Sequence, residues 1–213
     1  MLDAHKSGKE NANVSEMQKY AHDVFSRVSE IDNAFKTLNM SLEYLNKRDF
    51  KDSNYELSEH YSFHAENFLL RLTSVVDRCH LLAGTTVLLD KSKMERAGGN
   101  RYVLDLLKKD YPQAAETIKK LNDSVSQLRC SRNKVAHQEG YSNKNLIVIQ
   151  AMEGPSDEFS SEIEKVMSME NIKKIVREDI ASNFQPIVPV MNNLVTNLIN
   201  SFAVIYKSIV KDR

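Results

Sequence analysis

The fold of this chain is decided by residues 14–45, which read VSEMQKYAHDVFSRVSEIDNAFKTLNMSLEYL. Apolar residues recur here at alternating spacings of three and four, and this spacing keeps one narrow face of an α-helix apolar. The stripe consists of Val14, Met17, Ala21, Val24, Val28, Ile31, Phe35, Leu38, Leu42 and Leu45. We expect a long bundle helix that starts at Asn13, with Glu16 completing a capping box, although an exposed coiled coil has the same pattern.

Further helices are expected along the rest of the chain. The second long helix starts at Ser53, with Glu56 as its reciprocal cap. The others span about 101–109, 112–137, 161–181 and 189–210, and Gly140 ends the helix at 112–137. The run Leu146–Ile149 is β-like but too isolated to imply a sheet. We therefore predict an all-α protein: an up-and-down bundle of four to five long helices in one domain over 1–213, with a flexible tail at 1–12 and a loop insertion at 138–160.

The composition limits the possible function classes. The 213 residues include only 6 Gly and 4 Pro, which argues against a sandwich or barrel with many tight turns. The 29 basic and 29 acidic residues cancel, so a polyanion could bind only at a local patch. Between Lys91 and His137 there are eleven basic and five acidic residues, and between Gln138 and Glu170 two and seven. This contrast indicates either a polyanion-binding patch or two solvated faces.

Compartment is inferred from cysteine use and hydropathy. The two cysteines, Cys79 and Cys130, lie in helical patterns rather than in a metal-like cluster, which favours a reducing cytoplasm. The polar N-terminus has no signal-peptide core. The uncharged stretch 180–206 contains several asparagines and two prolines, so we expect a soluble helix and no membrane partner.

Arg132 is the candidate that the helical pattern singles out. In the helix expected over 112–137, Ile118, Leu121, Val125 and Leu128 define the apolar face, and Arg132 follows in register. Burying an unpaired guanidinium is costly, so Arg132 must meet a carboxylate or face a cleft open to an anion. His137 lies about 140° away around an ideal helix, so the two converge only through side-chain reach, helix distortion or a second subunit.

The hexamer Arg132-Asn133-Lys134-Val135-Ala136-His137 resembles the Arg-x(4–6)-His signature of the HEPN (higher eukaryotes and prokaryotes nucleotide-binding) superfamily, including its polar residue after the arginine. Residues 66–78 also resemble the second helix of some bacterial members. The resemblance implies an RNase that needs no metal or other cofactor. His137 would be the general acid or base, and Arg132 would hold the scissile phosphate. Asn133 would orient His137 or the phosphate. A second protomer usually completes such sites.

The resemblance departs from the toxin subgroup at one position. Members of that subgroup carry a modifiable tyrosine two residues after the histidine, where this chain has Glu139. That regulation is therefore not carried over. A role as a toxin or anti-phage effector, with an antitoxin or sensor partner, is implied by the family alone.

Further residues are candidates for contacts with RNA phosphates. Spaced donors suffice for such contacts. The candidates are Lys134, Arg129, His64, Arg71 and Arg78. For the last three, a solvated helix face is the favoured explanation, and the pair His60 and His64 lacks a third ligand for zinc. On the helix at 189–210 the uncharged polar side that contains Asn193, Asn197 and Asn200 predicts either a homodimer contact or a groove within the bundle.

Two alternatives to an endoribonuclease remain open. One is a non-catalytic HEPN-like domain that binds RNA or a nucleotide through the same cleft. The other is a helical interaction module that engages a partner through its first helix, in which Arg132 forms a buried ion pair and His137 satisfies carbonyls at a helix end.

Overall fold

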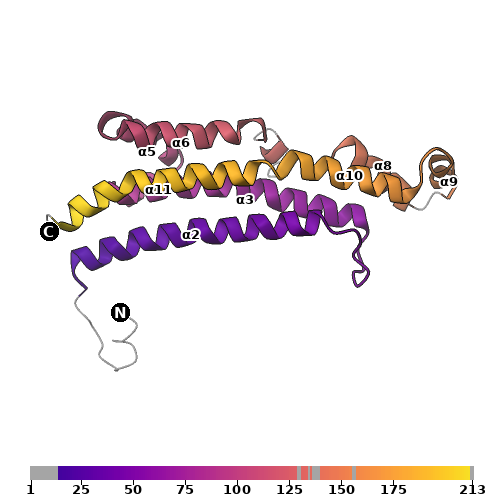
Figure 1. Ribbon diagram of the computed structural model, residues 1–213, viewed down its shortest axis with the longest axis horizontal. Helices are drawn as coiled ribbons and strands as arrows, with labels where there is room; N and C mark the ends of the chain where they lie inside the picture. Colours follow the sequence, from indigo (N-terminus) through magenta and orange to yellow (C-terminus); the bar gives the residue numbers. More distant parts are fainter. Residues whose placement is uncertain (1–13, 129–130, 134, 136–139, 155–156, 212–213) are drawn as a thin grey trace, which may run out of the picture. The chain divides into compact units, whose positions relative to one another are not determined.

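The computed structural model describes residues 14–128, 131–133, 135, 140–154 and 157–211. In these ranges every regular element is a helix and no strand occurs (Figure 1). The prediction of an all-α chain is therefore confirmed. The expected tail at 1–12 lies outside the described residues.

Three helices are much longer than the others. They are α2 (Glu16–Leu45), α3 (Leu57–Thr86) and α11 (Ile187–Lys211). Between α3 and α11 come α4 (Lys91–Met94), α5 (Gly99–Asp110), α6 (Pro112–Ser124), the 3-10 turn η1 (Ser126–Leu128), α8 (Lys144–Glu153), α9 (Asp157–Val166) and α10 (Met169–Phe184).

The first long helix begins with a capping box, shifted from the expected position. The Ser15 hydroxyl accepts the Gln18 backbone N–H at 3.1 Å, and the Gln18 side chain accepts the Ser15 N–H at 2.9 Å. Two of the N–H groups that a helix start leaves unpaired are thereby satisfied. Serine and glutamine form this box as well as the expected pair Asn13 and Glu16 would, so composition alone did not fix the register.

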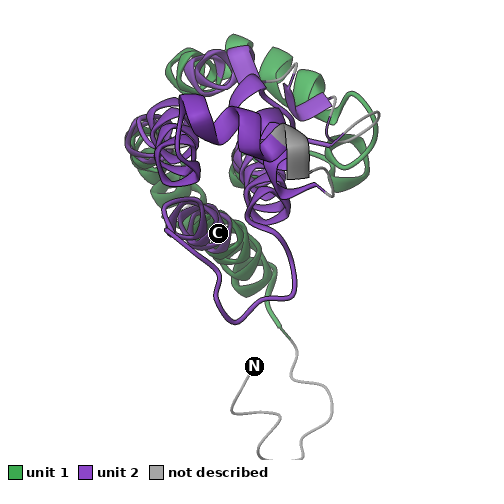
Figure 2. Ribbon diagram, turned by 90° about the vertical axis from the view of Figure 1, so that its right-hand side faces the viewer, with its two compact units in different colours: residues 1–32, 77–118, 196–213 green, residues 33–76, 119–195 purple. Residues whose placement is uncertain are grey.

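The contacts divide the chain into two compact units (Figure 2). Unit 1 comprises residues 1–32, 77–118 and 196–213, and unit 2 comprises 33–76 and 119–195. Each of α2, α3, α6 and α11 contributes to both units. That the chain forms one domain stays a prediction.

Unit 1 contains the end of α3 and the turn that follows it. The Leu89 N–H donates to the Gly84 carbonyl and the Leu88 N–H donates to the Thr85 carbonyl, which is a Schellman ending. Leu88 occupies the left-handed position, with φ of 58°, that glycine usually takes. The buried Tyr20 also fastens α2 to this turn, because its hydroxyl donates to the Thr86 carbonyl at 2.9 Å.

Unit 2 is held by an aromatic core. Phe68 on α3 and Phe184 at the end of α10 are almost fully buried, and their rings stack with centroids 4.5 Å apart. The loop between α2 and α3 is fastened by the Tyr61 hydroxyl, which donates to the Lys47 carbonyl at 3.2 Å. The Glu153 carboxylate accepts the Ser58 N–H at 3.1 Å near the start of α3.

Three local expectations were wrong. The β-like run Leu146–Ile149 lies in α8, within the expected loop insertion at 138–160, because Asn143 caps the helix and Leu146, Ile149 and Met152 are buried at helical spacing. The helix expected over 112–137 is broken after Ser124. The helix expected over 161–181 is divided between α9 and α10.

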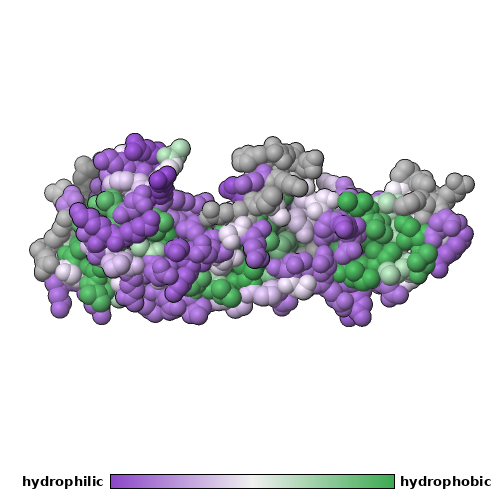
Figure 3. All heavy atoms as spheres, turned by 90° about the horizontal axis from the view of Figure 1, so that it is seen from above, coloured by the Kyte–Doolittle hydropathy of each residue, from purple (hydrophilic) through white to green (hydrophobic). Residues whose placement is uncertain are grey.

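Apolar residues reach the surface near the C-terminal part of unit 2. Figure 3 shows hydrophobic side chains over α8 and α10, where Ile147 and Ile175 are 54% and 40% exposed. By length and composition alone, the stretch Met169–Lys211 could cross a membrane. Core helices of soluble proteins pass the same test, so this is weak evidence for a membrane segment.

Candidate functional site

Arg132 is helical and follows the break in the helix predicted over 112–137. Since α6 ends at Ser124 and η1 follows, the register that placed Arg132 in line with Val125 does not extend across the break. The residue is nevertheless half-buried. Its Nη1 donates to the Asn133 side-chain oxygen at 3.1 Å. Asn133 itself is exposed.

One nitrogen of this guanidinium has no hydrogen-bond partner among the described residues. Arg132 Nε is buried and makes no hydrogen bond with any part of the chain that the structure describes. A buried donor left unpaired costs about 1–3 kcal/mol, and an arginine cannot relieve that cost by losing its proton. Arg132 is therefore suited to donate a hydrogen bond to an anionic oxygen, such as one on a phosphate.

The structure describes Asn133 and Val135 of the predicted motif besides Arg132. His137, Lys134 and Arg129 lie outside the described residues, as does Cys130. The expected angle of about 140° between Arg132 and His137 assumed an unbroken helix.

The segment that follows the motif is bound tightly to α3. The Tyr141 N–H donates to Glu66 Oε1 at 2.6 Å, and the Ser62 hydroxyl donates to the Tyr141 carbonyl at 3.0 Å. Ser62 and Glu66 are four residues apart on one helix face, so they reach both backbone groups of one residue. We call this pair the α3 clamp.

The same segment is held on its other side by α10. The Asn143 amide donates to Asp179 at 3.3 Å, while its oxygen accepts the Leu146 N–H at 2.7 Å and caps α8. The Tyr141 ring packs 6.0 Å from that of Phe184. Burial raises the pKa of Tyr141, so its hydroxyl stays neutral. None of these residues was a sequence candidate, and Gly140, interpreted only as a helix stop, was the nearest signal.

The chain as a whole matches a known protein family. A family model described as HEPN_Cthe2314-like HEPN matches residues 9–208, nearly the whole chain. The chain belongs to the HEPN family. No curated protein and no solved structure matches it significantly. Membership associates the chain with RNA-related nuclease or nucleotide-binding functions.

In this HEPN chain, His64 belongs to an aromatic cluster. Its ring stacks on Tyr44 at 4.5 Å, and the His60 ring stacks on Phe50 at 3.8 Å. Lys47 Nζ lies 4.1 Å from the centre of the Tyr44 ring. The two histidines therefore hold the loop after α2 against α3. Burial, His60 and Lys47 lower the pKa of His64.

The two arginines proposed to bind RNA differ in environment. Arg71 is exposed and its Nε donates to the Asn67 oxygen at 3.3 Å, so it can still meet a phosphate. Arg78 belongs to unit 1 and donates to the Glu30 carbonyl at 2.6 Å, which joins α3 to α2. Arg78 thus has a structural use within the HEPN domain.

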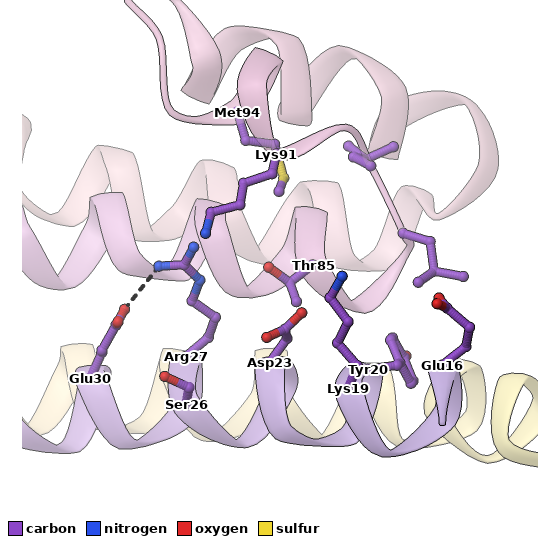
Figure 4. A pocket seen from close by; sticks show the side chains of 12 residues that line it. Glu16, Lys19, Tyr20, Asp23, Ser26, Arg27, Glu30, Thr85, Lys91 and Met94 are labelled. Carbon is purple, nitrogen blue, oxygen red and sulfur yellow. Dashed lines mark hydrogen bonds and ion pairs between the residues drawn. The ribbon is translucent and has the colours of Figure 1, made fainter. Parts of the chain in front are cut away.

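Two further features concern metal and ligand binding. Among the described residues, no group of three or more His, Cys, Asp or Glu is placed to hold a metal ion. A pocket of about 330 Å³ in unit 1 receives the side chains of Lys19, Asp23, Arg27 and Lys91 (Figure 4). Arg27 is engaged there by Glu30 at 3.2 Å and by Glu95 at 2.9 Å. Since cations and anions in this pocket balance, we assign no ligand to it.

Proposed function

We propose that this chain is an endoribonuclease of HEPN type that cleaves RNA without a metal ion. The observation that carries the proposal is the half-buried guanidinium of Arg132, whose Nε–H has no partner among the described residues of a HEPN-family chain. A scissile phosphate supplies the acceptor that this donor lacks. The fixed positive charge offsets the negative charge that develops on the phosphoryl oxygens.

The proposed chemistry begins with attack by the ribose 2′-oxygen on the adjacent phosphorus. His137 removes the proton of the 2′-OH as that bond forms. The bond from phosphorus to the 5′-oxygen then breaks, and the 5′-oxygen takes up a proton. The products are a 2′,3′-cyclic phosphate and a 5′-hydroxyl, so neither oxidant nor cofactor is consumed.

One imidazole cannot accept and donate a proton at the same moment. A second copy of His137 would supply the missing acid, which favours a site shared by two protomers. The uncharged side of α11, where Asn193, Asn197 and Asn200 are exposed, is the proposed homodimer contact. Asn197→Arg should convert the dimer to a monomer in light scattering and reduce cleavage with it. A wild-type protein that is monomeric at micromolar concentration overturns the shared site.

The RNA path is proposed to run over basic residues near Arg132. Lys134 and Arg129, which are close to Arg132 in the sequence, would contact the phosphates on either side of the cut, and Arg71 would contact another one. Asn133 would orient His137 or the scissile phosphate. A cytoplasmic role as a toxin or anti-phage effector, without a membrane partner, fits this activity. An antitoxin or sensor protein would then control it.

The decisive experiment uses single-stranded RNA in the presence of EDTA. Wild-type protein should cleave it, while His137→Ala and Arg132→Ala should not. An RNA with a single 2′-deoxy residue at the mapped cut site should be resistant there. Equal cleavage by all three proteins would remove these residues from the chemistry. Binding without cleavage by the wild type would favour the non-catalytic RNA- or nucleotide-binding alternative.

A further inference from the structure

The α3 clamp grips a residue that follows the proposed general base closely in sequence. Tyr141 is four positions after His137, and both of its backbone polar groups are bound by side chains of α3. The contact with Glu66 joins residues 75 positions apart, at 2.6 Å. A charged acceptor on a backbone N–H is among the stronger hydrogen bonds in proteins.

Gly140 shows how closely the segment approaches α3. A Cβ atom at this position would lie 2.7 Å from Glu66 Oε1, closer than real side chains come. Its φ is outside the left-handed region, so the backbone itself would tolerate alanine. An alanine at this position would therefore force the Glu66 carboxylate to shift.

The other contacts of the segment leave the backbone of Tyr141 to the clamp. Asn143 is bound to Asp179 through its side chain, and the Tyr141 ring rests against Phe184. These contacts fix side chains on the α10 side. Glu66 and Ser62 fix the peptide groups on the α3 side.

We propose that Glu66, with Ser62, is a positioning residue of the ribonuclease site, because it fixes the backbone of Tyr141, four residues after His137. This inference rests on the proposed function. Glu66 does not touch the substrate. It fixes the backbone of Tyr141 and thereby limits the positions that His137, four residues earlier in the chain, can take relative to the phosphate held by Arg132.

The first arm of the test measures cleavage by variants at Glu66. Glu66→Ala removes the acceptor and should lower kcat about 10- to 100-fold, because a displacement of about 1 Å costs that much. KM should stay within about twofold, since Arg132 still binds phosphate. Glu66→Gln keeps an oxygen for the Tyr141 N–H and should recover most of the rate. Glu43→Ala, which removes an exposed glutamate of α2, is the control.

The second arm uses Gly140 to test the same contact. Gly140→Ala should lower kcat in the wild-type background because its methyl displaces the Glu66 carboxylate. In a Glu66→Ala background the same change should have a much smaller effect, because the clashing atom is gone. Additive losses in the free energy of activation from kcat would show that the two residues act separately. This result would overturn the proposed positioning role of Glu66.

The third arm does not depend on activity. Removing the acceptor should speed hydrogen exchange of the Tyr141 amide about tenfold or more. It should also shift the His137 imidazole NMR signal, which is assigned from its absence in His137→Ala. Glu66→Gln should leave both near their wild-type values.

The outcomes separate the two claims. Cleavage by the wild type with an unimpaired Glu66→Ala overturns the inference and leaves the proposed function standing. Equal losses in Glu66→Ala and Glu66→Gln show that charge matters rather than the hydrogen bond, which also overturns it. If the wild type does not cleave RNA, the proposed function fails. In that case, a shift of the His137 signal in Glu66→Ala alone still supports the positioning role of Glu66, and an unchanged signal contradicts it.

Discussion

Phe68 and Phe184 stack in the core of unit 2 with ring centroids 4.5 Å apart and an angle of 16° between their planes. They join α3 to the end of α10, and the Tyr141 ring packs against the second of them. This stack therefore links the core to the segment that follows the proposed site.

Phe184→Ala should lower the free energy of unfolding by about 3–5 kcal/mol, because it leaves a cavity in the core. Urea unfolding followed by circular dichroism measures the change. Phe25→Ala is the control, since the Phe25 side chain is 70% exposed and its loss should cost about 0.5 kcal/mol or less. Similar costs for the two variants would contradict the packing described for unit 2.

Arg132→Lys should not rescue the activity lost in Arg132→Ala. A lysine supplies the charge but not the planar set of donors, and a lost donor of this kind costs about 10²–10³ in kcat. Neither variant should unfold at a lower temperature than the wild type, because the buried Nε has no partner to lose among the described residues. Full activity in the lysine variant would show that only charge is needed.

The aromatic cluster around His64 should make stability depend on pH. The pKa of His64 is lowered in the folded chain by burial, by His60 and by Lys47, so the unfolded chain binds the proton more readily. Stability is therefore greatest above the ordinary pKa of 6.5 and falls as the pH drops below it.

His64→Phe keeps the stack on Tyr44 and removes one titrating group. Its free energy of unfolding should fall less than that of the wild type between about pH 7.5 and pH 5. His22→Gln, at an exposed position, should keep the wild-type slope. Parallel curves for His64→Phe and the wild type would exclude His64 as a source of the pH dependence.

Leu88→Gly should be more stable than Leu88→Ala by about 1 kcal/mol, because φ at this position is 58° and a Cβ atom is strained there. The two variants both lose the leucine side chain, so their difference isolates the backbone term. Thermal unfolding of the pair provides the measurement. An alanine variant as stable as the glycine variant would mean that the turn relaxes away from this conformation.

The long helices were predictable because their apolar residues repeat without interruption. Ile31, Leu38, Leu42 and Leu45 are buried as the stripe in α2 requires. The break after Ser124 was not predictable, since Val125, Leu128 and Arg132 continue the helical spacing through it. Periodicity indicates which residues are expected to be buried, but not whether the backbone between them stays helical.

The site was predicted only in part for a related reason. Arg132 was singled out because a charge stood in an apolar register, and its half-buried guanidinium agrees with that reasoning, although the register itself ends at the break. Glu66 and Ser62 gave no signal, because a polar residue on a half-exposed helix face is ordinary. Their use depends on a backbone group 75 residues away, which local patterns do not contain.

The hold on Tyr141 has a consequence for synthesis on the ribosome. Its partners on α3 are made before it, but Asp179 and Phe184 follow it by 38 and 43 residues. Domains assemble only once their distant segments have emerged from the exit tunnel. A nascent chain that stops before α10 therefore contains the complete Arg132–His137 motif but lacks Asp179 and Phe184. The motif is translated well before the contacts that α10 makes with the segment after it can form.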